Sequence, residues 1–174
     1  MTPQNRLLFL VGMPASGKST VGYVLAQQLG YAFSDTDALI EEKLQLSVKE
    51  IFEKYDESFF RTQEQLLLSD FALLSTPTVI ATGGGFPCFS GNMEHLLRLG
   101  TVVFLNANRS LLQERLSKKS LSRPLLSDAN SLAERLQKLW EARIEVYKRA
   151  HFTIEIHENS LPYNLATEIQ SKMI

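Results

Sequence analysis

A glycine-rich segment near the amino terminus carries the strongest chemical signal in the sequence. Residues 12–19 read Gly-Met-Pro-Ala-Ser-Gly-Lys-Ser, the G-x-x-x-x-G-K-[ST] spacing of a phosphate-binding loop. Backbone N–H groups of such a loop surround phosphate, Lys18 reaches the β and γ oxygens, and Ser19 can ligate Mg²⁺. The alternative is a chance glycine turn, which would not require the lysine and serine. The predicted nucleotide-binding residues are Gly12, Ala15, Ser16, Gly17, Lys18, Ser19 and Thr20.

Two carboxylates, Asp35 and Asp37, follow a short apolar segment in Phe-Ser-Asp-Thr-Asp. The end of a parallel strand is where open α/β sheets bind ligands. If this segment is extended, residues two apart point the same way. Asp35 could then hold Mg²⁺ through water while Asp37 accepts the proton of an acceptor hydroxyl. The alternative is that Asp37 only caps the helix that follows.

Two arginines interrupt apolar helical stripes. Arg61 lies three residues before Glu64 on a stripe that includes Phe60 and Leu67, and Arg143 lies on a stripe that ends at Tyr147. A buried guanidinium needs an anionic partner, so both could face a ligand anion. The alternatives are a solvated surface pair for Arg61 and a side chain reaching solvent from the stripe's edge for Arg143.

A glycine triplet and a later arginine could complete the site. Gly83, Gly84 and Gly85 follow the third predicted strand, where backbone N–H groups can approach a ligand closely; a flexible turn is the alternative. Arg123 stands in a polar segment, residues 117–130, that could close over the transferring phosphoryl group, or could be an ordinary surface connection.

The elements expected to position these residues alternate between strands and helices. Short apolar runs predict strands at Leu7–Val11, Thr78–Ala81, Val102–Leu105 and Phe152–Ile156, with a weaker one at Tyr31–Ser34. Capping boxes predict helix starts at Ser47, Ser110 and Ser131, and Gly30 and Gly100 stand where helices should end. This alternation predicts α/β architecture with a parallel sheet.

The composition argues against several classes of protein. The 174 residues suit one domain, and a net charge of -1 from 18 basic and 19 acidic residues does not suggest a nucleic-acid binder. One cysteine, Cys88, suits a reducing compartment, and the three histidines lack zinc-ligand spacing. The apolar run at 7–11 is too short to span a membrane, so we expect a cytoplasmic protein.

Six segments, taken in order, resemble the shikimate kinase family over nearly the whole chain. They are G-M-P-A-S-G-K-S, D-T-D, F-R-T-Q-E, G-G-G, R-P-L-L and R-I-E-V-Y. The resemblance implies a single-domain P-loop kinase, residues 1–174, with a nucleoside-monophosphate-kinase-like fold, a five-stranded parallel sheet and a mobile lid at about residues 113–130. It also implies transfer of the γ-phosphoryl group of ATP to the 3-hydroxyl of shikimate, with Mg²⁺ as cofactor, by a monomer.

The resemblance also implies individual roles. Lys18, Asp37 and Arg123 would be catalytic, with Arg123 also touching the nucleotide phosphates, and Ser19 and Asp35 would serve the metal. Asp37, Arg61, Gly83, Gly84, Gly85 and Arg143 would hold shikimate. Arg115 is nearest to the family's adenine-contacting arginine, but the resemblance leaves the base contacts unassigned.

Two other functions remain open from the sequence. Gluconate kinase shares the fold and the phosphate loop, but needs no paired arginines around a carboxylated ring. A regulatory module that binds nucleotide without catalysis is a different class, which the presence of Asp37 and Arg123 disfavours.

Overall fold

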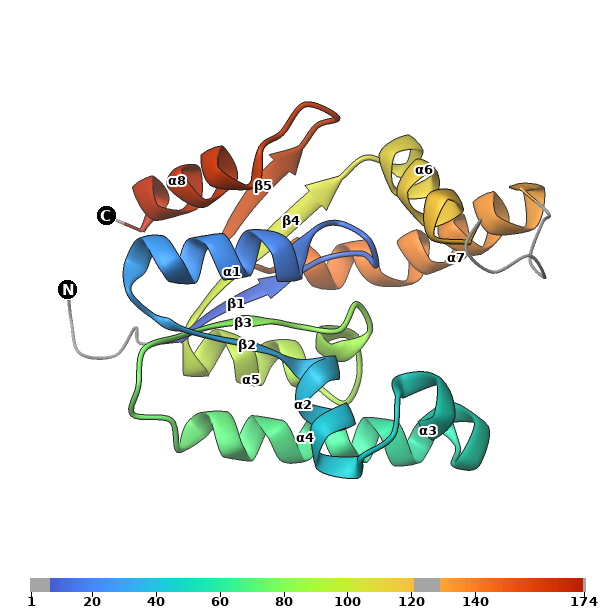
Figure 1. Cartoon of the computed structure of the whole chain (residues 1–174), viewed down its shortest axis with the longest axis horizontal. Coiled ribbons are helices and arrows are strands. Elements are labelled where there is room, and N and C mark those ends of the chain that lie inside the picture. Colours follow the sequence, from blue (N-terminus) through green and yellow to red (C-terminus); the bar gives the residue numbers. More distant parts are fainter. Residues whose placement is uncertain (1–6, 121–128, 174) are drawn as a thin grey trace.

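Five parallel strands form the centre of the protein (Figure 1). The computed structural model describes residues 7–120 and 129–173, with the side chains at 119–131 outside that description. The strands are β1 (Leu7–Val11), β2 (Ala32–Asp35), β3 (Thr78–Ala81), β4 (Thr101–Ala107) and β5 (Phe152–Ile156), in the spatial order β2-β3-β1-β4-β5. The predicted α/β fold with a five-stranded parallel sheet is confirmed.

Helices flank the sheet, and α1 and α8 lie side by side along it (Figure 1). The helices are α1 (Lys18–Leu29), α2 (Thr36–Leu44), α3 (Val48–Lys54), α4 (Glu57–Ala72), the 3₁₀ turn η1 (Phe86–Cys88), α5 (Asn92–Leu99), α6 (Arg109–Ser120), α7 (Ala129–Tyr147) and α8 (Pro162–Lys172). None of the helices within 7–120 and 129–173 is long and apolar enough to cross a membrane.

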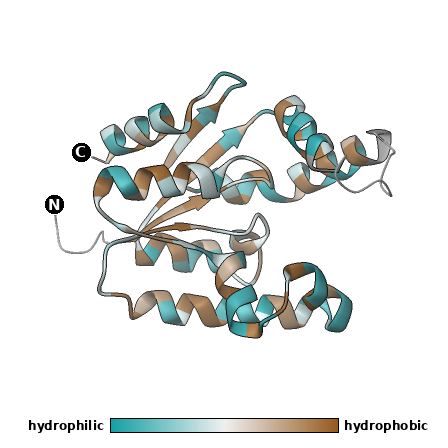
Figure 2. Cartoon of the chain, viewed as in Figure 1, coloured by the Kyte–Doolittle hydropathy of each residue, from teal (hydrophilic) through white to brown (hydrophobic). Residues whose placement is uncertain are grey.

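The core is built on β1, which pairs with β3 on one side and β4 on the other. All five residues of β1 are buried, as are the four of β3. A strand covered on both faces has no solvent side, which explains why these strands are continuous apolar runs without alternation. In Figure 2, β1 is mostly brown, whereas α1 and α4 carry both brown and teal residues.

The path of the chain reverses its direction across the sheet between β1 and β3. After β1 the chain runs through α1 to β2, at one edge of the sheet, whereas after β3 it passes through η1 and α5 to β4 on the other side of β1. In open α/β sheets, ligands bind at the carboxyl ends of the strands, next to such a reversal. The phosphate loop follows β1 and the glycine triplet follows β3, so both lie at this end of the sheet.

The predicted boundaries hold for some elements and not for others. Ser47 forms its capping box with Glu50, and Gly30 ends α1 with a φ of 66°. Ser110 was the wrong cap, because α6 begins one residue earlier and Asn108 Oδ1 accepts from the Leu111 N–H (2.8 Å). The start predicted at Ser131 is also wrong, because α7 begins at Ala129. The weak strand is confirmed, one residue later than predicted.

Candidate active site

The phosphate loop joins β1 to α1 as its motif predicted. Gly12 has a φ of 145° and Gly17 one of 99°, values that side chains rarely adopt. A Cβ on Gly12 would also lie 2.7 Å from the Leu105 carbonyl oxygen. Lys18 is the first residue of α1, and its Nζ donates to the carbonyl oxygens of Gly12 (2.9 Å) and Met13 (2.8 Å). The ammonium group is therefore held over the loop that phosphate would occupy.

A cavity of about 430 Å³ opens from this loop. Its walls include Ala15 to Thr20 from the loop and α1, and Ile156, Pro162 and Leu165 from β5 and α8. Arg115 of α6 also lines it and donates from Nη1 to the Ala15 carbonyl oxygen (3.1 Å). A polar end next to an apolar end suits a nucleotide, which is charged at its phosphates and flat and largely apolar at its base.

The two aspartates do not share an extended segment, so that part of the prediction is wrong. Asp35 ends β2 and caps α2, because its Oδ1 accepts from the backbone N–H of Asp37 (3.0 Å) and Ala38 (3.4 Å). The chain is therefore helical from Thr36 onward, and Asp37 lies in the first turn of α2. The alternative role of Asp37 as the helix cap is wrong as well, since Asp35 fills that position.

Asp35 also reaches the phosphate loop. Ser19 Oγ donates to Asp35 Oδ2 (2.6 Å), which links the start of α1 to the end of β2. A hydroxyl and a carboxylate oxygen are the donor types that Mg²⁺ prefers, so this pair fits the predicted metal position. Within 7–120 and 129–173, His, Cys, Asp and Glu form no cluster of three or more suited to a metal. The remaining Mg²⁺ ligands would have to be phosphate and water, as is usual for this ion.

Asp37 is half-buried among charged groups. Burial raises the pKa of its carboxyl group and the neighbouring Asp35 carboxylate raises it further, while Lys18 and Arg61 act in the opposite direction. All of these groups are therefore close enough to Asp37 to influence its charge. A carboxyl group whose pKa is shifted upward is a better proton acceptor than an exposed aspartate.

The glycine triplet packs directly against the other predicted site residues. A Cβ on Gly83 would lie 2.5 Å from Asp37 Oδ1, and one on Gly85 would lie 2.9 Å from both Arg61 Nη atoms. A Cβ on Gly84 would lie 2.9 Å from Pro14 Cδ in the phosphate loop. The triplet thus joins the phosphate loop, α2 and α4, and the lack of side chains is what permits these approaches.

Arg61 is held by a network that the sequence predicted only in part. Its Nη1 donates to Glu64 Oε2 (2.7 Å), as predicted, while Nε (3.1 Å) and Nη2 (2.8 Å) donate to Glu57 Oε1. Glu64 is 1% exposed, and burial raises the pKa of its carboxyl group although the ion pair with Arg61 opposes the shift. The interpretation of Arg61 and Glu64 as a solvated surface pair is therefore wrong.

Arg143 approaches the same cluster from α7. It is half-buried and close enough to Glu64 to act on the pKa of that carboxyl group. Tyr147, one turn later, is fully buried and donates from its hydroxyl to the Gly84 carbonyl oxygen (2.6 Å). Burial raises the pKa of the Tyr147 hydroxyl and of the nearby Cys88 thiol. Both groups therefore stay neutral and serve as packing and hydrogen-bonding groups.

Sequence reasoning missed several of these neighbours. Glu57 could have been found, because it stands four residues before Arg61 on the same helix, the spacing of a helical ion pair. The hydrogen bond from Tyr147 to Gly84, the Phe89 ring 3.7 Å from Arg61 Cζ and the apolar cavity wall from β5 and α8 had no local signal, because these contacts form only through tertiary packing. Arg123 lies outside the described residues, so its predicted position over the phosphates stays a prediction.

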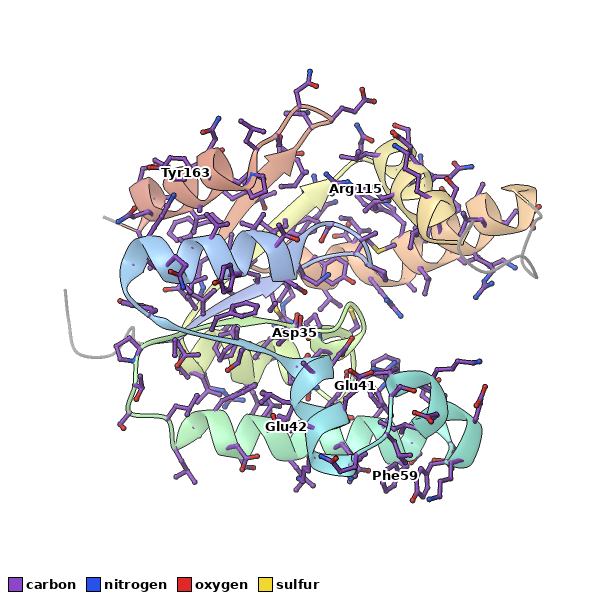
Figure 3. All side chains as sticks on the ribbon, in the orientation of Figure 1. Asp35, Glu41, Glu42, Phe59, Arg115 and Tyr163 are labelled. Atoms are coloured by element: carbon purple, nitrogen blue, oxygen red, sulfur yellow. The ribbon has the colours of Figure 1, made fainter. Side chains whose placement is uncertain are left out.

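The strand order, the phosphate loop and the position of the glycine triplet define the class of protein as a P-loop kinase. Figure 3 shows the surroundings of the loop, with Asp35 and Arg115 on opposite sides of the start of α1 in this view. The family model described as "Shikimate kinase" matches residues 14–174. The chain therefore belongs to the shikimate kinase family, and the predicted family and ATP-dependent kinase activity are confirmed.

Individual relatives agree with the family match. A shikimate kinase of Rippkaea orientalis is 41% identical over 162 residues, which cover 93% of this chain and 84% of the relative. One of Clostridium botulinum is 41% identical over 148 residues, covering 84% and 85%. The solved structure of shikimate kinase from Acinetobacter baumannii in complex with shikimate has a TM-score of 0.87 at 35% identity, covering 98% of this chain and 94% of that one.

Proposed function

We propose that this protein transfers the γ-phosphoryl group of ATP to the 3-hydroxyl of shikimate, giving shikimate 3-phosphate and ADP for aromatic amino-acid biosynthesis. One observation carries the assignment of the acceptor site. The glycine triplet after β3 contacts the Asp37 carboxylate at one end and the Arg61 guanidinium at the other. A proton acceptor and a carboxylate-binding group thus stand on either side of one short backbone segment, next to the phosphate loop.

The nucleotide would lie in the cavity at the start of α1. Residues 12–20 would surround the phosphates, with Lys18 neutralising charge on the β and γ oxygens, and the wall that contains Ile156 and Pro162 would take the base. Ser19, and Asp35 through water, would hold Mg²⁺, which neutralises phosphate charge when bound. The Ser19 to Asp35 hydrogen bond supports this proposal, because it already places the two oxygen donors together.

Shikimate would bind between α2, α4 and α7. Arg61 and Arg143 would hold its carboxylate, with the backbone of Gly83 to Gly85 beside the ring. Asp37 would orient the 3-hydroxyl and accept its proton as the new O–P bond forms and the bond from the γ-phosphorus to the bridging oxygen of ADP breaks. Phosphoryl transfer depends mainly on positioning and charge neutralisation, so Lys18 should contribute more to the rate than Asp37.

The remaining expectations belong to the same proposal. Arg123 would approach the phosphates from a lid at about 113–130, of which residues up to 120 continue α6. A single catalytic domain, the monomeric state and the cytoplasmic location stay predictions.

The decisive experiment measures ADP release from Mg-ATP with shikimate, with gluconate, with nucleoside monophosphates and without acceptor. We expect release that depends on shikimate and a large increase in the KM for shikimate in Arg61→Ala and Arg143→Ala. Release with gluconate or a nucleotide instead would retain the phosphate site and reject the acceptor. No release with any acceptor would favour the regulatory module.

A further inference from the structure

The Arg61 guanidinium is fixed by contacts to more than its two carboxylate partners. The guanidinium has five N–H donors, of which the described contacts use three, on Nε, Nη1 and Nη2. Among residues 7–120 and 129–173, the other two donors have no hydrogen-bond partner, and we assign them to the ligand. The side chain is only 16% exposed, and the ion pairs constrain the edge of the guanidinium but leave its faces to other neighbours.

An aromatic ring covers the guanidinium. Arg61 Cζ lies 3.7 Å from the centre of the Phe89 ring, well inside the distance of about 6 Å at which a cation is attracted to an aromatic face. Phe60, the preceding residue on α4, is farther away at 5.6 Å. Phe89 comes from a different element, the segment between η1 and α5, so it adds a constraint that α4 alone does not provide.

The segment that carries Phe89 is itself fixed by hydrogen bonds. The Phe89 carbonyl oxygen accepts from the Asn92 N–H (2.9 Å), and Asn92 Nδ2 donates to the Phe86 carbonyl oxygen (2.8 Å). Asn92 is 1% exposed, so these bonds are shielded from water. Gly85, which directly precedes η1, packs its backbone against both Arg61 Nη atoms. Residues 85–89 thus lie along the guanidinium and are held in place by these hydrogen bonds.

We propose that Phe89 is a positioning residue for the acceptor: its ring holds the Arg61 guanidinium in the orientation that binds the shikimate carboxylate. Phe89 donates no hydrogen bond from its side chain and need not touch the substrate, because it acts through Arg61. A flat guanidinium stacked on a ring loses little freedom when it binds an anion, which lowers the entropic cost of binding. This inference rests on the proposed role of Arg61.

The test compares Phe89→Leu, Phe89→Tyr and Phe59→Leu by steady-state kinetics with both substrates. Leu keeps an apolar side chain but removes the aromatic face, so the KM for shikimate should rise about fivefold while the KM for ATP changes less than about twofold. Tyr keeps the face and should retain a KM close to that of the unmodified protein. Phe59→Leu is the matched control, because Phe59 is another phenylalanine of the same region whose ring stacks on Tyr55, with the ring centres 4.2 Å apart; Figure 3 shows Phe59 apart from Asp35.

A second arm places Phe89→Leu in an Arg61→Lys background. A lysine ammonium group has no plane to stack on the ring, so the added effect of Phe89→Leu there should fall below about twofold. Equal effects of Phe89→Leu in both backgrounds, equal effects of Leu and Tyr at position 89, or an unchanged KM in Phe89→Leu would each overturn the inference. If Phe89→Leu unfolds at a lower temperature than the unmodified protein, Phe89→Met takes its place, because the methionine side chain is similar in size to that of leucine.

The Arg61→Ala variant separates this inference from the proposed function. If Arg61→Ala leaves the KM for shikimate unchanged, the proposed binding of the shikimate carboxylate by Arg61 is wrong, and the proposed role of Phe89 is wrong as well. If Arg61→Ala raises that KM but Phe89→Leu does not, carboxylate binding by Arg61 is supported and only the role of Phe89 is rejected.

Discussion

Adding one methyl group at Gly83 should separate the positioning of Asp37 from the stability of the fold. A Cβ at this position would lie 2.5 Å from Asp37 Oδ1, whereas ordinary contact begins near 3.4 Å. The carboxylate must therefore retreat by about 0.9 Å or rotate away. A misplacement of about 1 Å can cost roughly a hundredfold in rate, which corresponds to about 2.7 kcal/mol. We expect Gly83→Ala to lower kcat by about that factor.

The fold should tolerate this substitution. Gly83 is not among the residues with positive φ, and its N–H can still donate to Thr36 Oγ1 (2.7 Å) because alanine keeps that group. Replacing glycine by alanine in a compatible conformation also restricts the unfolded chain, which stabilises a protein by about 0.4–1 kcal/mol. The thermal midpoint of unfolding of Gly83→Ala should thus equal or exceed that of the unmodified protein.

Gly30→Ala is the matched control, because it should lower stability and leave kcat unchanged, the reverse of what we expect for Gly83→Ala. Gly30 ends α1 with a φ of 66°, and no heavy atom lies within 4 Å of an added Cβ. The left-handed conformation should cost alanine about 1 kcal/mol and lower the midpoint by about 2–4 °C, while kcat stays unchanged. Kinetics and thermal unfolding of both variants check this pair. A kcat for Gly83→Ala within threefold of the unmodified value would refute the reasoning about Asp37.

Three further predictions concern the same site. Lys18→Met should lose more activity than Asp37→Asn, because charge neutralisation outweighs proton acceptance; comparable kcat values would contradict this ranking. The raised pKa of Asp37 means that its neutral form contributes stability below about pH 3.8, which is lost as pH rises through the folded-state pKa. Asp37→Asn without ligands should therefore melt at a higher temperature than the unmodified protein at pH 8, with the difference shrinking toward pH 4. Tyr147→Phe removes the donor to the Gly84 carbonyl oxygen and should cost about 1–2 kcal/mol in urea unfolding; an unchanged midpoint would mean that this bond contributes nothing.

Features that depend on residues near one another in the chain were predictable from the sequence. The phosphate loop needs two glycines, a lysine and a serine at set spacing, and a strand before it and a helix after it complete the pattern. The capping box at Ser47 and the pairing of Arg61 with Glu64 likewise involve residues three positions apart. Local geometry determines these contacts, and local spacing therefore predicts them.

The error in the predicted backbone of Asp35 and Asp37 arose because the local sequence is compatible with two conformations. Both an extended segment and an early helix start were compatible with Phe-Ser-Asp-Thr-Asp, and both aspartates are good helix caps. Asp35 takes the cap, which turns Thr36 and Asp37 into the first turn of α2. The sequence identified the right carboxylates but not the backbone that carries them.

Only the tertiary structure determines which side chains meet at the acceptor site. Gly85 and Phe89 meet the Arg61 guanidinium because the segment after β3 packs against α4, and Tyr147 reaches Gly84 across 63 positions of the chain. Such contacts depend on strand order and helix packing, which no spacing within one segment encodes. The sequence by itself therefore determined the phosphate loop and the kinds of group at the acceptor site. The fold decided their positions, because packing between distant segments brings these groups to the same end of the sheet.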